Sequence, residues 1–345
     1  MTDQRKPLVV ASPPRPHRSR QPSHAQDAST RVAPRHGRAR LSSGRQLAYS
    51  EVGATSGTAV LFLHGNPGSR REVLRPRYAE AFHQAGLRVV SIDRPGYGDS
   101  DAPTQKGHLP FVDDVRCLMD QLDLDRAVVV GHSRGTLPAI SLGVLLQRRI
   151  AAVGVFGPTG LPDDPHLLAA QSREARWMLK LVKSVPVVAR LLIRANDRLD
   201  RWFPHSAAMR MARLMSSAAD RAQLRATGEE YTGTLAAGMQ RDPAFAIDDW
   251  RSWLVDPLGF DPTGIPVPLL LWTGTEDGLC PAAPVRDMAR RIPKASLREV
   301  PGIGHLHSPE ILVELMQETL KAGGSIPKTR LKTGHGKNPA ISIDR

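Results

Sequence analysis

Cysteine is scarce in this chain, with Cys117 and Cys280 the only two among 345 residues. Two cysteines cannot build a disulfide framework, and their spacing matches no zinc-binding pattern. Both are therefore expected to be reduced thiols, which are typical of a cytoplasmic protein. The sequence predicts a cytoplasmic location and gives no reason to expect a structural metal site.

Several other signals are missing. No apolar run approaches the length of a membrane span, and no period of 20 to 50 residues repeats along the chain. Zinc-hydrolase and nucleotide-binding patterns are also lacking, namely H-E-x-x-H, a G-x-G-x-x-G after a strand, and G-x-x-x-x-G-K-[ST]. We therefore expect no membrane-spanning segment, no repeat architecture, no metal and no cofactor.

The net charge of +13 is confined to two tails. Residues 1–40 carry nine Lys or Arg against two Asp, residues 321–345 carry six against one, and the rest is close to neutral. Both tails lack apolar periodicity, so we predict disorder for residues 1–40 and 323–345. A transit peptide, or contact of the first tail with an acidic partner, is a weaker alternative. Specific nucleic-acid binding is not expected, because no aromatic residues or known motif accompany the charge.

The chain between the tails divides into three segments. Residues 41–157 alternate strand-like and helix-like patterns after a hairpin that turns at Ser43–Gly44, and residues 263–322 resume that alternation. Residues 158–262 contain helical patterns and no clear strand. The sequence therefore predicts an α/β fold, with a mostly parallel central sheet flanked by helices and a helical lid inserted at 158–262. The large apolar residues of the lid are expected to be mainly lid core: Trp177, Met178, Trp202, Phe203, Tyr231, Phe245, Trp250 and Trp253.

One short motif carries chemistry. In VVVGHSRGTLPA, residues 128–139, a buried strand leads into Ser133, which stands between Gly131 and Gly135. A sharp turn from strand to helix strains the backbone of the residue that it exposes, so its neighbours must be small. The pattern fits G-x-S-x-G and predicts a nucleophilic serine, against the alternative of an ordinary turn serine.

A serine needs a base to accept its proton and a carboxylate to orient that base. Asp277 lies in the loop after the LLLW strand, and His305 follows the last strand, in PGIGHLHS. The order Ser, Asp, His is the order that this kind of elbow uses.

Four motifs in sequence order give the chain a resemblance to the α/β-hydrolase superfamily over residues 41–320. They are HGNPGS, DRPGYGDS, GHSRG, and the pair GTEDGLCP and GIGHLH. The resemblance implies Ser133 as nucleophile, Asp277 as acid and His305 as base. It also implies an oxyanion hole made by the backbone N–H groups of Asn66 and Arg134.

Nearby polar residues have their own alternatives. Glu276 competes with Asp277 for the role of acid, but the spacing from Gly274 favours Asp277. His307 is expected at a helix start or pocket wall, whereas His64 and His132 are expected to brace the loops that hold them. Cys280, near the acid loop, is expected to be a buried and inert thiol.

These observations predict a cofactor-independent serine hydrolase that cleaves an ester-like bond in a small to medium, mostly apolar substrate. Family members that open epoxides carry an aspartate where this chain has Ser133, so epoxide chemistry is not expected. Aminopeptidase, thioesterase, lactonase, C–C hydrolase and perhydrolase or haloperoxidase activities remain open, because the lid selects the substrate. A ligand-binding protein on the same fold is the alternative outside enzymes. The sequence does not indicate whether the chain forms homo-oligomers.

Overall fold

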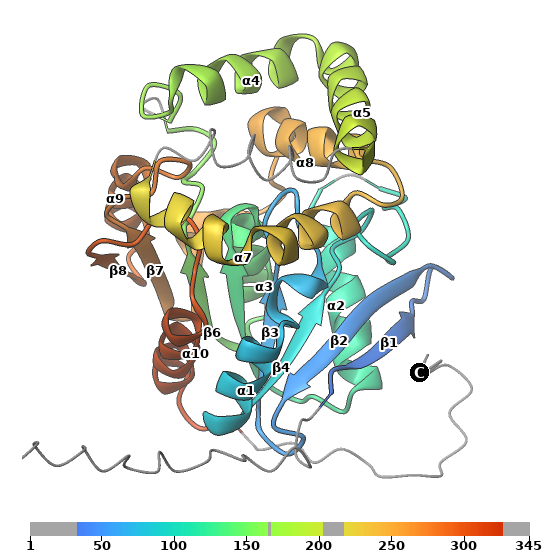
Figure 1. Cartoon of the computed structure of the whole chain (residues 1–345). Coiled ribbons are helices and arrows are strands. Elements are labelled where there is room, and N and C mark those ends of the chain that lie inside the picture. Colours follow the sequence, from blue (N-terminus) through green and yellow to red (C-terminus); the bar gives the residue numbers. More distant parts are fainter. Residues whose placement is uncertain (1–32, 106, 165–166, 203–216, 327–345) are drawn as a thin grey trace, which may run out of the picture. The chain divides into compact units, whose positions relative to one another are not determined.

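The structure is a computed structural model that describes residues 33–105, 107–164, 167–202 and 217–326. Its centre is an eight-stranded sheet in the order β1-β2-β4-β3-β5-β6-β7-β8 (Figure 1). The first two strands are antiparallel to their neighbours, and the other strands are parallel. The predicted α/β class with a mostly parallel sheet is confirmed. The strands are β1 (Arg35–Arg40), β2 (Gln46–Gly53), β3 (Thr58–Leu63), β4 (Leu87–Ile92), β5 (Ala127–His132), β6 (Ile150–Phe156), β7 (Leu269–Gly274) and β8 (Ala295–Val300).

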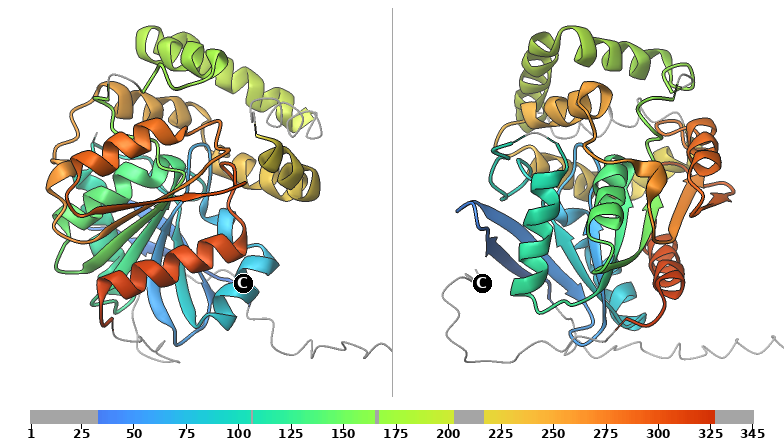
Figure 2. Two further views of the ribbon diagram at one scale, coloured as in Figure 1. Left: turned by 90° about the vertical axis from the view of Figure 1, so that its left-hand side faces the viewer. Right: turned by 180° about the vertical axis from the view of Figure 1, so that it is seen from behind.

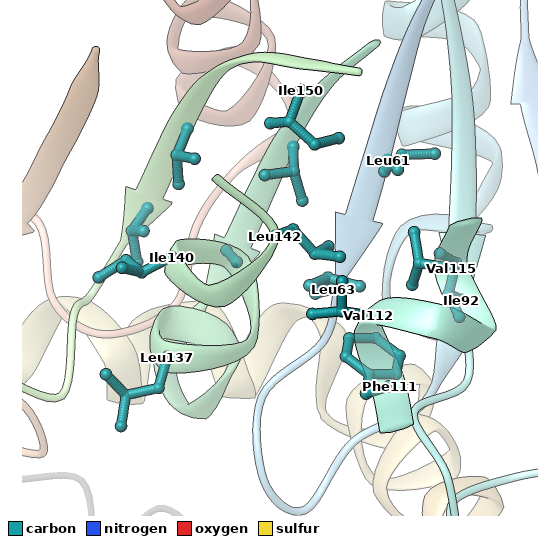
Figure 3. Close-up of a cluster of buried hydrophobic side chains, with 14 of the residues drawn as sticks. Leu61, Leu63, Ile92, Phe111, Val112, Val115, Leu137, Ile140, Leu142 and Ile150 are labelled. Atoms are coloured by element: carbon teal, nitrogen blue, oxygen red, sulfur yellow. The ribbon is translucent and has the colours of Figure 1, made fainter. Parts of the chain in front are cut away.

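Helices cover both faces of the sheet (Figure 2). The parallel strands are buried on both sides, so successive residues enter opposite cores: Leu61 packs into one cluster and Phe62 into the other. One cluster joins the strands to α2, α3 and α9, and Figure 3 shows part of it; the other joins them to α1 and α10. These helices are α1 (Pro76–Gln84), α2 (Leu109–Gln121), α3 (Thr136–Leu145), α9 (Ala282–Arg291) and α10 (Pro309–Gly323).

The prediction of disorder up to residue 40 was wrong at its boundary, because β1 is a strand that pairs with β2. Its inward positions are filled by small residues. A Cβ on Gly37 would lie 2.5 Å from the ring of Tyr49, and Ala39 is buried. Glycine and alanine at these positions give no alternation of large apolar and polar residues, so hydrophobic periodicity does not predict this strand. The expected turn is present, since the Gly44 N–H donates to the carbonyl of Leu41.

Four α-helices lie between β6 and β7 in the part of this segment that the structure describes, which is the segment predicted as a lid. They are α4 (Arg173–Ser184), α5 (Pro186–Trp202), α7 (Ala218–Gly238) and α8 (Ala244–Val255). They lie at the carboxyl ends of the parallel strands (Figure 1). None of the described residues of 158–262 forms a strand. None of the described helices is long and apolar enough to cross a membrane.

The aromatic residues of this segment differ from the expectation of a shared core. Trp253 is buried and Trp250 packs against it, whereas Trp177, Met178 and Trp202 are exposed. Phe203 lies outside the described residues. The amphipathic pattern of α4 and α5 therefore places these three side chains on a face that no other described element covers.

Candidate active site

The serine predicted as nucleophile stands at a strained turn. β5 ends at His132, and Ser133 has φ 51°, a left-handed conformation that is rare for residues other than glycine. A Cβ on Gly131 would lie 2.6 Å from the carbonyl oxygen of Gly135, and one on Gly135 would lie 2.5 Å from that of Leu63. The two glycines therefore permit the close backbone approach that this elbow requires.

Asp277 and His305 are brought together from the ends of neighbouring strands. Asp277 follows β7, His305 follows β8, and His305 Nδ1 lies 2.8 Å from Asp277 Oδ2. The other carboxylate oxygen accepts hydrogen bonds from the backbone N–H groups of Leu279 and Cys280. In the neutral imidazole, the Nδ1–H directed to the carboxylate leaves the lone pair on Nε2. Glu276, the competing acid, is exposed.

The Asp277 carboxylate also sets the basicity of the histidine. Burial on its own lowers the pKa of His305, but the adjacent negative charge of Asp277 raises this pKa well above its ordinary value of 6.5. Gly157, after β6, lies against both groups, since a Cβ there would be 3.1 Å from His305 Nδ1 and 3.3 Å from Asp277 Oδ2. The ends of three parallel strands thus enclose the pair.

Cys280 lies closer to this site than the sequence indicated. Its sulfur lies within 4.8 Å of a ring nitrogen of His305 and of a carboxylate oxygen of Asp277, so the thiol stands beside the histidine–carboxylate pair. The expected burial is observed. Burial raises the pKa of Cys280, which keeps it in the thiol form.

The loop that carries His305 is anchored by a residue that the sequence analysis missed. Asp220, in the first turn of α7, accepts hydrogen bonds from the backbone N–H groups of His305 and Leu306, at 2.9 Å and 2.8 Å. Gly304 is required there, because a Cβ would lie 2.3 Å from the Asp220 carboxylate. No local signal could have revealed this contact, since the partners are 85 and 86 residues apart.

A second buried network lies behind the elbow. Glu72 Oε1 is 2.6 Å from His132 Nδ1 and 2.8 Å from His307 Nε2. His132 Nε2 in turn contacts the carbonyl of His305 at 3.1 Å, so the network joins the elbow to the histidine loop. Burial on its own raises the pKa of Glu72, but the two histidines hold it well below its ordinary value. His307 lines a small cavity, as expected for a pocket wall.

Two groups of described side chains bring metal-binding atoms within 4.8 Å of one another. One is Glu72, His132 and His307, and the other is Asp277, Cys280 and His305. In the first group Glu72 is hydrogen-bonded to His307 and in close contact with His132, and in the second group Asp277 is hydrogen-bonded to His305 and to two backbone N–H groups. The arrangement therefore needs no metal to explain it.

The loop expected to supply the oxyanion hole follows β3. The backbone of Gly65 lies against Ser133, because a Cβ on this glycine would be 3.2 Å from the Cβ of the serine. His64 Nδ1 donates to the carbonyl of Gly65 and Nε2 accepts from the N–H of Arg94, so His64 braces the loop as expected. Burial and the charge of Arg94 lower the pKa of His64 to about 3, which keeps it neutral.

The five predicted site residues therefore occupy one region of the fold. Ser133 stands at the elbow, Asp277 and His305 form the adjacent pair, and Asn66 and Arg134 belong to the two loops that flank the serine. The side chain of Asn66 donates to the carbonyl of Ala246 in α8. The oxyanion role of the Asn66 and Arg134 N–H groups stays a prediction.

Comparison with known proteins agrees with this geometry. The family model of the alpha/beta hydrolase fold matches residues 58–310. The chain belongs to this family, as the motifs predicted.

Three individual proteins that the chain resembles share 30% sequence identity or less with it. The chain is 27% identical over 286 residues to a dihydrolipoyllysine-residue acetyltransferase component of an acetoin cleaving system from Pseudomonas putida; the match covers 80% of this chain and 66% of that protein. It is 30% identical over 174 residues to a bifunctional epoxide hydrolase 2 from Sus scrofa, covering 49% of this chain and 30% of the relative. The chain thus spans only part of the length of these relatives. A thermophilic esterase from Thermogutta terrifontis superposes with a TM-score of 0.62 at 21% identity, covering 84% of this chain and 99% of the esterase.

Proposed function

We propose that the protein is a cofactor-independent serine hydrolase that cleaves an ester-like acyl bond in a small to medium substrate. The observation that carries the proposal is the strained elbow at Ser133 beside the hydrogen-bonded pair of Asp277 and His305. A binding protein would not need a strained serine next to a histidine whose second nitrogen is held by a carboxylate.

In the proposed reaction Ser133 Oγ attacks the carbonyl carbon of the substrate while its proton moves to His305 Nε2. The carbonyl oxygen becomes an oxyanion, which the N–H groups of Asn66 and Arg134 stabilise, each by about 10²–10³ in rate. The leaving alcohol takes the proton from His305, and an acyl-enzyme remains. Water then gives its proton to His305 and attacks the acyl carbon, which releases the acid and regenerates the serine.

The serine distinguishes this proposal from the epoxide chemistry of the Sus scrofa relative. A carboxylate nucleophile forms an alkyl ester that is hydrolysed at the carbonyl of the enzyme, and a serine offers no such carbonyl. We further propose that the helices between β6 and β7 act as a lid, because α7 and α8 hold the histidine loop and the Asn66 loop. The two free thiols, Cys117 and Cys280, favour a cytoplasmic location.

Labelling with a fluorophosphonate tests the proposal without knowledge of the substrate. Intact-protein mass spectrometry should show one adduct on the wild type and none on Ser133→Ala. Ser141→Ala is the matched control, because Ser141 is a buried serine in α3 whose hydroxyl donates to the carbonyl of Pro138. An adduct on Ser133→Ala, or none on folded wild type, would refute the assignment.

A further inference from the structure

Arg134, the residue after the proposed nucleophile, has a buried side chain that is poorly neutralised. Only 2% of this side chain is exposed. Its guanidinium lies over the indole rings of Trp250 and Trp253 in α8, 5.1 Å and 4.8 Å from their centres. Stacking on two rings fixes the guanidinium in place but leaves its full charge.

Among the described residues, the one acid paired with Arg134 is Asp249, and its carboxylate is already shared. Arg134 Nη2 contacts Asp249 Oδ1 at 3.4 Å, which is long for a charged pair. Oδ2 of the same carboxylate accepts hydrogen bonds from Arg94, Tyr97 and Asn66, at 2.8 Å, 2.9 Å and 3.0 Å. Asp249 therefore neutralises Arg94 first, and two buried guanidinium groups share one carboxylate.

The neighbouring titratable groups do not supply the missing negative charge. Burial and the charge of Arg134 lower the pKa of His108 to about 4, so His108 is neutral at pH 7. Burial raises the pKa of Tyr97 well above its ordinary value, so this phenol is neutral as well. Glu72 and Asp277 are held by the histidines described above. The cluster keeps a net charge of about +1, and an unpaired buried charge is costly.

Several hydrogen-bond donors of the cluster also lack a partner. Among the described residues, Nε and Nη1 of Arg134, Nε of Arg94 and Nε1 of Trp253 are buried N–H groups without an acceptor. Buried donors in folded proteins nearly always find a partner, so four in one place mark a site that receives an acceptor from outside the chain. Asn66 Oδ1 is a buried acceptor of the same cluster that also has no partner, but these four groups all donate. Donors beside surplus positive charge select an anion.

The cluster lies beside the proposed nucleophile, so a substrate bound to Ser133 would contact it. Arg134 adjoins Ser133 in the chain, and Asn66 of the proposed oxyanion loop bonds directly to Asp249. We propose that Arg134, with Arg94 and the Trp253 indole, forms a carboxylate subsite beside the nucleophile. The substrates are accordingly acyl compounds that carry a carboxylate, such as hemiesters of dicarboxylic acids. This inference rests on the proposed serine-hydrolase function and narrows the mostly apolar substrate predicted from the sequence.

A pair of matched esters tests the subsite. The carboxylate ester is mono-4-nitrophenyl glutarate, and the neutral one is the same molecule with its carboxylate methylated. We expect the wild type to prefer the carboxylate ester in kcat/KM by about tenfold to a hundredfold, the range of a hydrogen-bonded charge pair. Arg134→Met should abolish this preference, and Arg134→Lys, which keeps the charge, should retain part of it.

Two further variants make the test directional. Asp249→Asn removes the competing carboxylate, so it should increase the preference for the carboxylate ester. Arg190→Met is the matched control. Arg190 of α5 pairs with Asp248, the neighbour of Asp249 in α8, but its side chain is 38% exposed and lies outside the cluster. This substitution should leave the preference unchanged. The preference should also persist in 0.5 M NaCl, roughly where surface attraction by the basic tails is screened.

Each outcome decides the question. A wild type that favours the neutral ester, or an Arg134→Met variant that keeps the full preference, overturns the carboxylate subsite. Hydrolysis of neither ester also overturns it, and fluorophosphonate labelling of Ser133 in the same sample would then show that the serine-hydrolase proposal still stands. Failure to label Ser133 would instead refute the proposed function itself.

Discussion

Asp277 holds His305 by a single hydrogen bond of 2.8 Å, between Oδ2 and Nδ1. Its other oxygen is fixed by the N–H groups of Leu279 and Cys280, so the carboxylate cannot rotate without losing two backbone partners. This anchoring fixes both the tautomer and the orientation of the imidazole, on which the proposed proton transfer from Ser133 depends.

Asp277→Asn should lower kcat/KM by about four orders of magnitude, because the amide can present its N–H₂ to Nδ1 and so favour the wrong tautomer. Steady-state hydrolysis of the best 4-nitrophenyl ester provides the measurement. Glu276→Gln is the neighbouring control, and since Glu276 is exposed its activity should stay within about twofold. A larger loss in Glu276→Gln would mean that the acid is misassigned.

The pH profile should report the charge of His305. The imidazole must be neutral to accept the serine proton, so activity falls as pH drops through its pKa. Because Asp277 raises this pKa above 6.5, the acidic limb of kcat/KM should lie above pH 6.5. Measurement between pH 5 and 9 would locate the limb. A limb below pH 6.5 would contradict the raised pKa.

The sequence indicated those parts of the site that depend on local geometry. The elbow was predictable because a strained serine needs the small neighbours Gly131 and Gly135, and these stand next to it in the chain. Asp277 and His305 were predictable because parallel strands end at the same edge of the sheet. Each of these signals spans only a few residues.

The contacts that complete the site join distant segments and left no local signal. Asp220 and Asp249 belong to helices of the inserted segment, and each looks like an ordinary acidic residue on a helix. Asp249 meets Arg94 across 155 positions in the chain. Their roles follow from how α7 and α8 pack on the loops of the sheet, which hydrophobic periodicity does not specify. The same limit concealed the position of the Cys280 thiol.

Asp220→Ala should impair catalysis and stability together. The substitution leaves the N–H groups of His305 and Leu306 without their acceptor, at a cost of about 1–3 kcal/mol for each buried group. Asp220→Asn keeps one acceptor oxygen and should lose less. Thermal unfolding and kcat/KM on the same samples would measure both effects. If Asp220→Ala keeps both the activity and the melting temperature of the wild type, the loop does not depend on this anchor.

Glu72→Gln should destabilise the fold by about 3–5 kcal/mol at pH 7, because it breaks a buried charged network while leaving both histidines in place. Glu314→Gln is a suitable control. Glu314 pairs with Arg298 at the surface, where such a change costs about 1 kcal/mol or less. Chemical denaturation at pH 7 would give both values.

The same variant makes a prediction about acid stability. The folded pKa of Glu72 lies well below its ordinary value of 4.5, so its contribution is fully present above pH 4.5 and is lost as pH falls toward the folded pKa. The difference in unfolding free energy between wild type and Glu72→Gln should therefore be constant from about pH 7 to 5 and shrink below about 4.5. A difference that stays constant down to about pH 3 would mean that the carboxylate is not held ionised by His132 and His307.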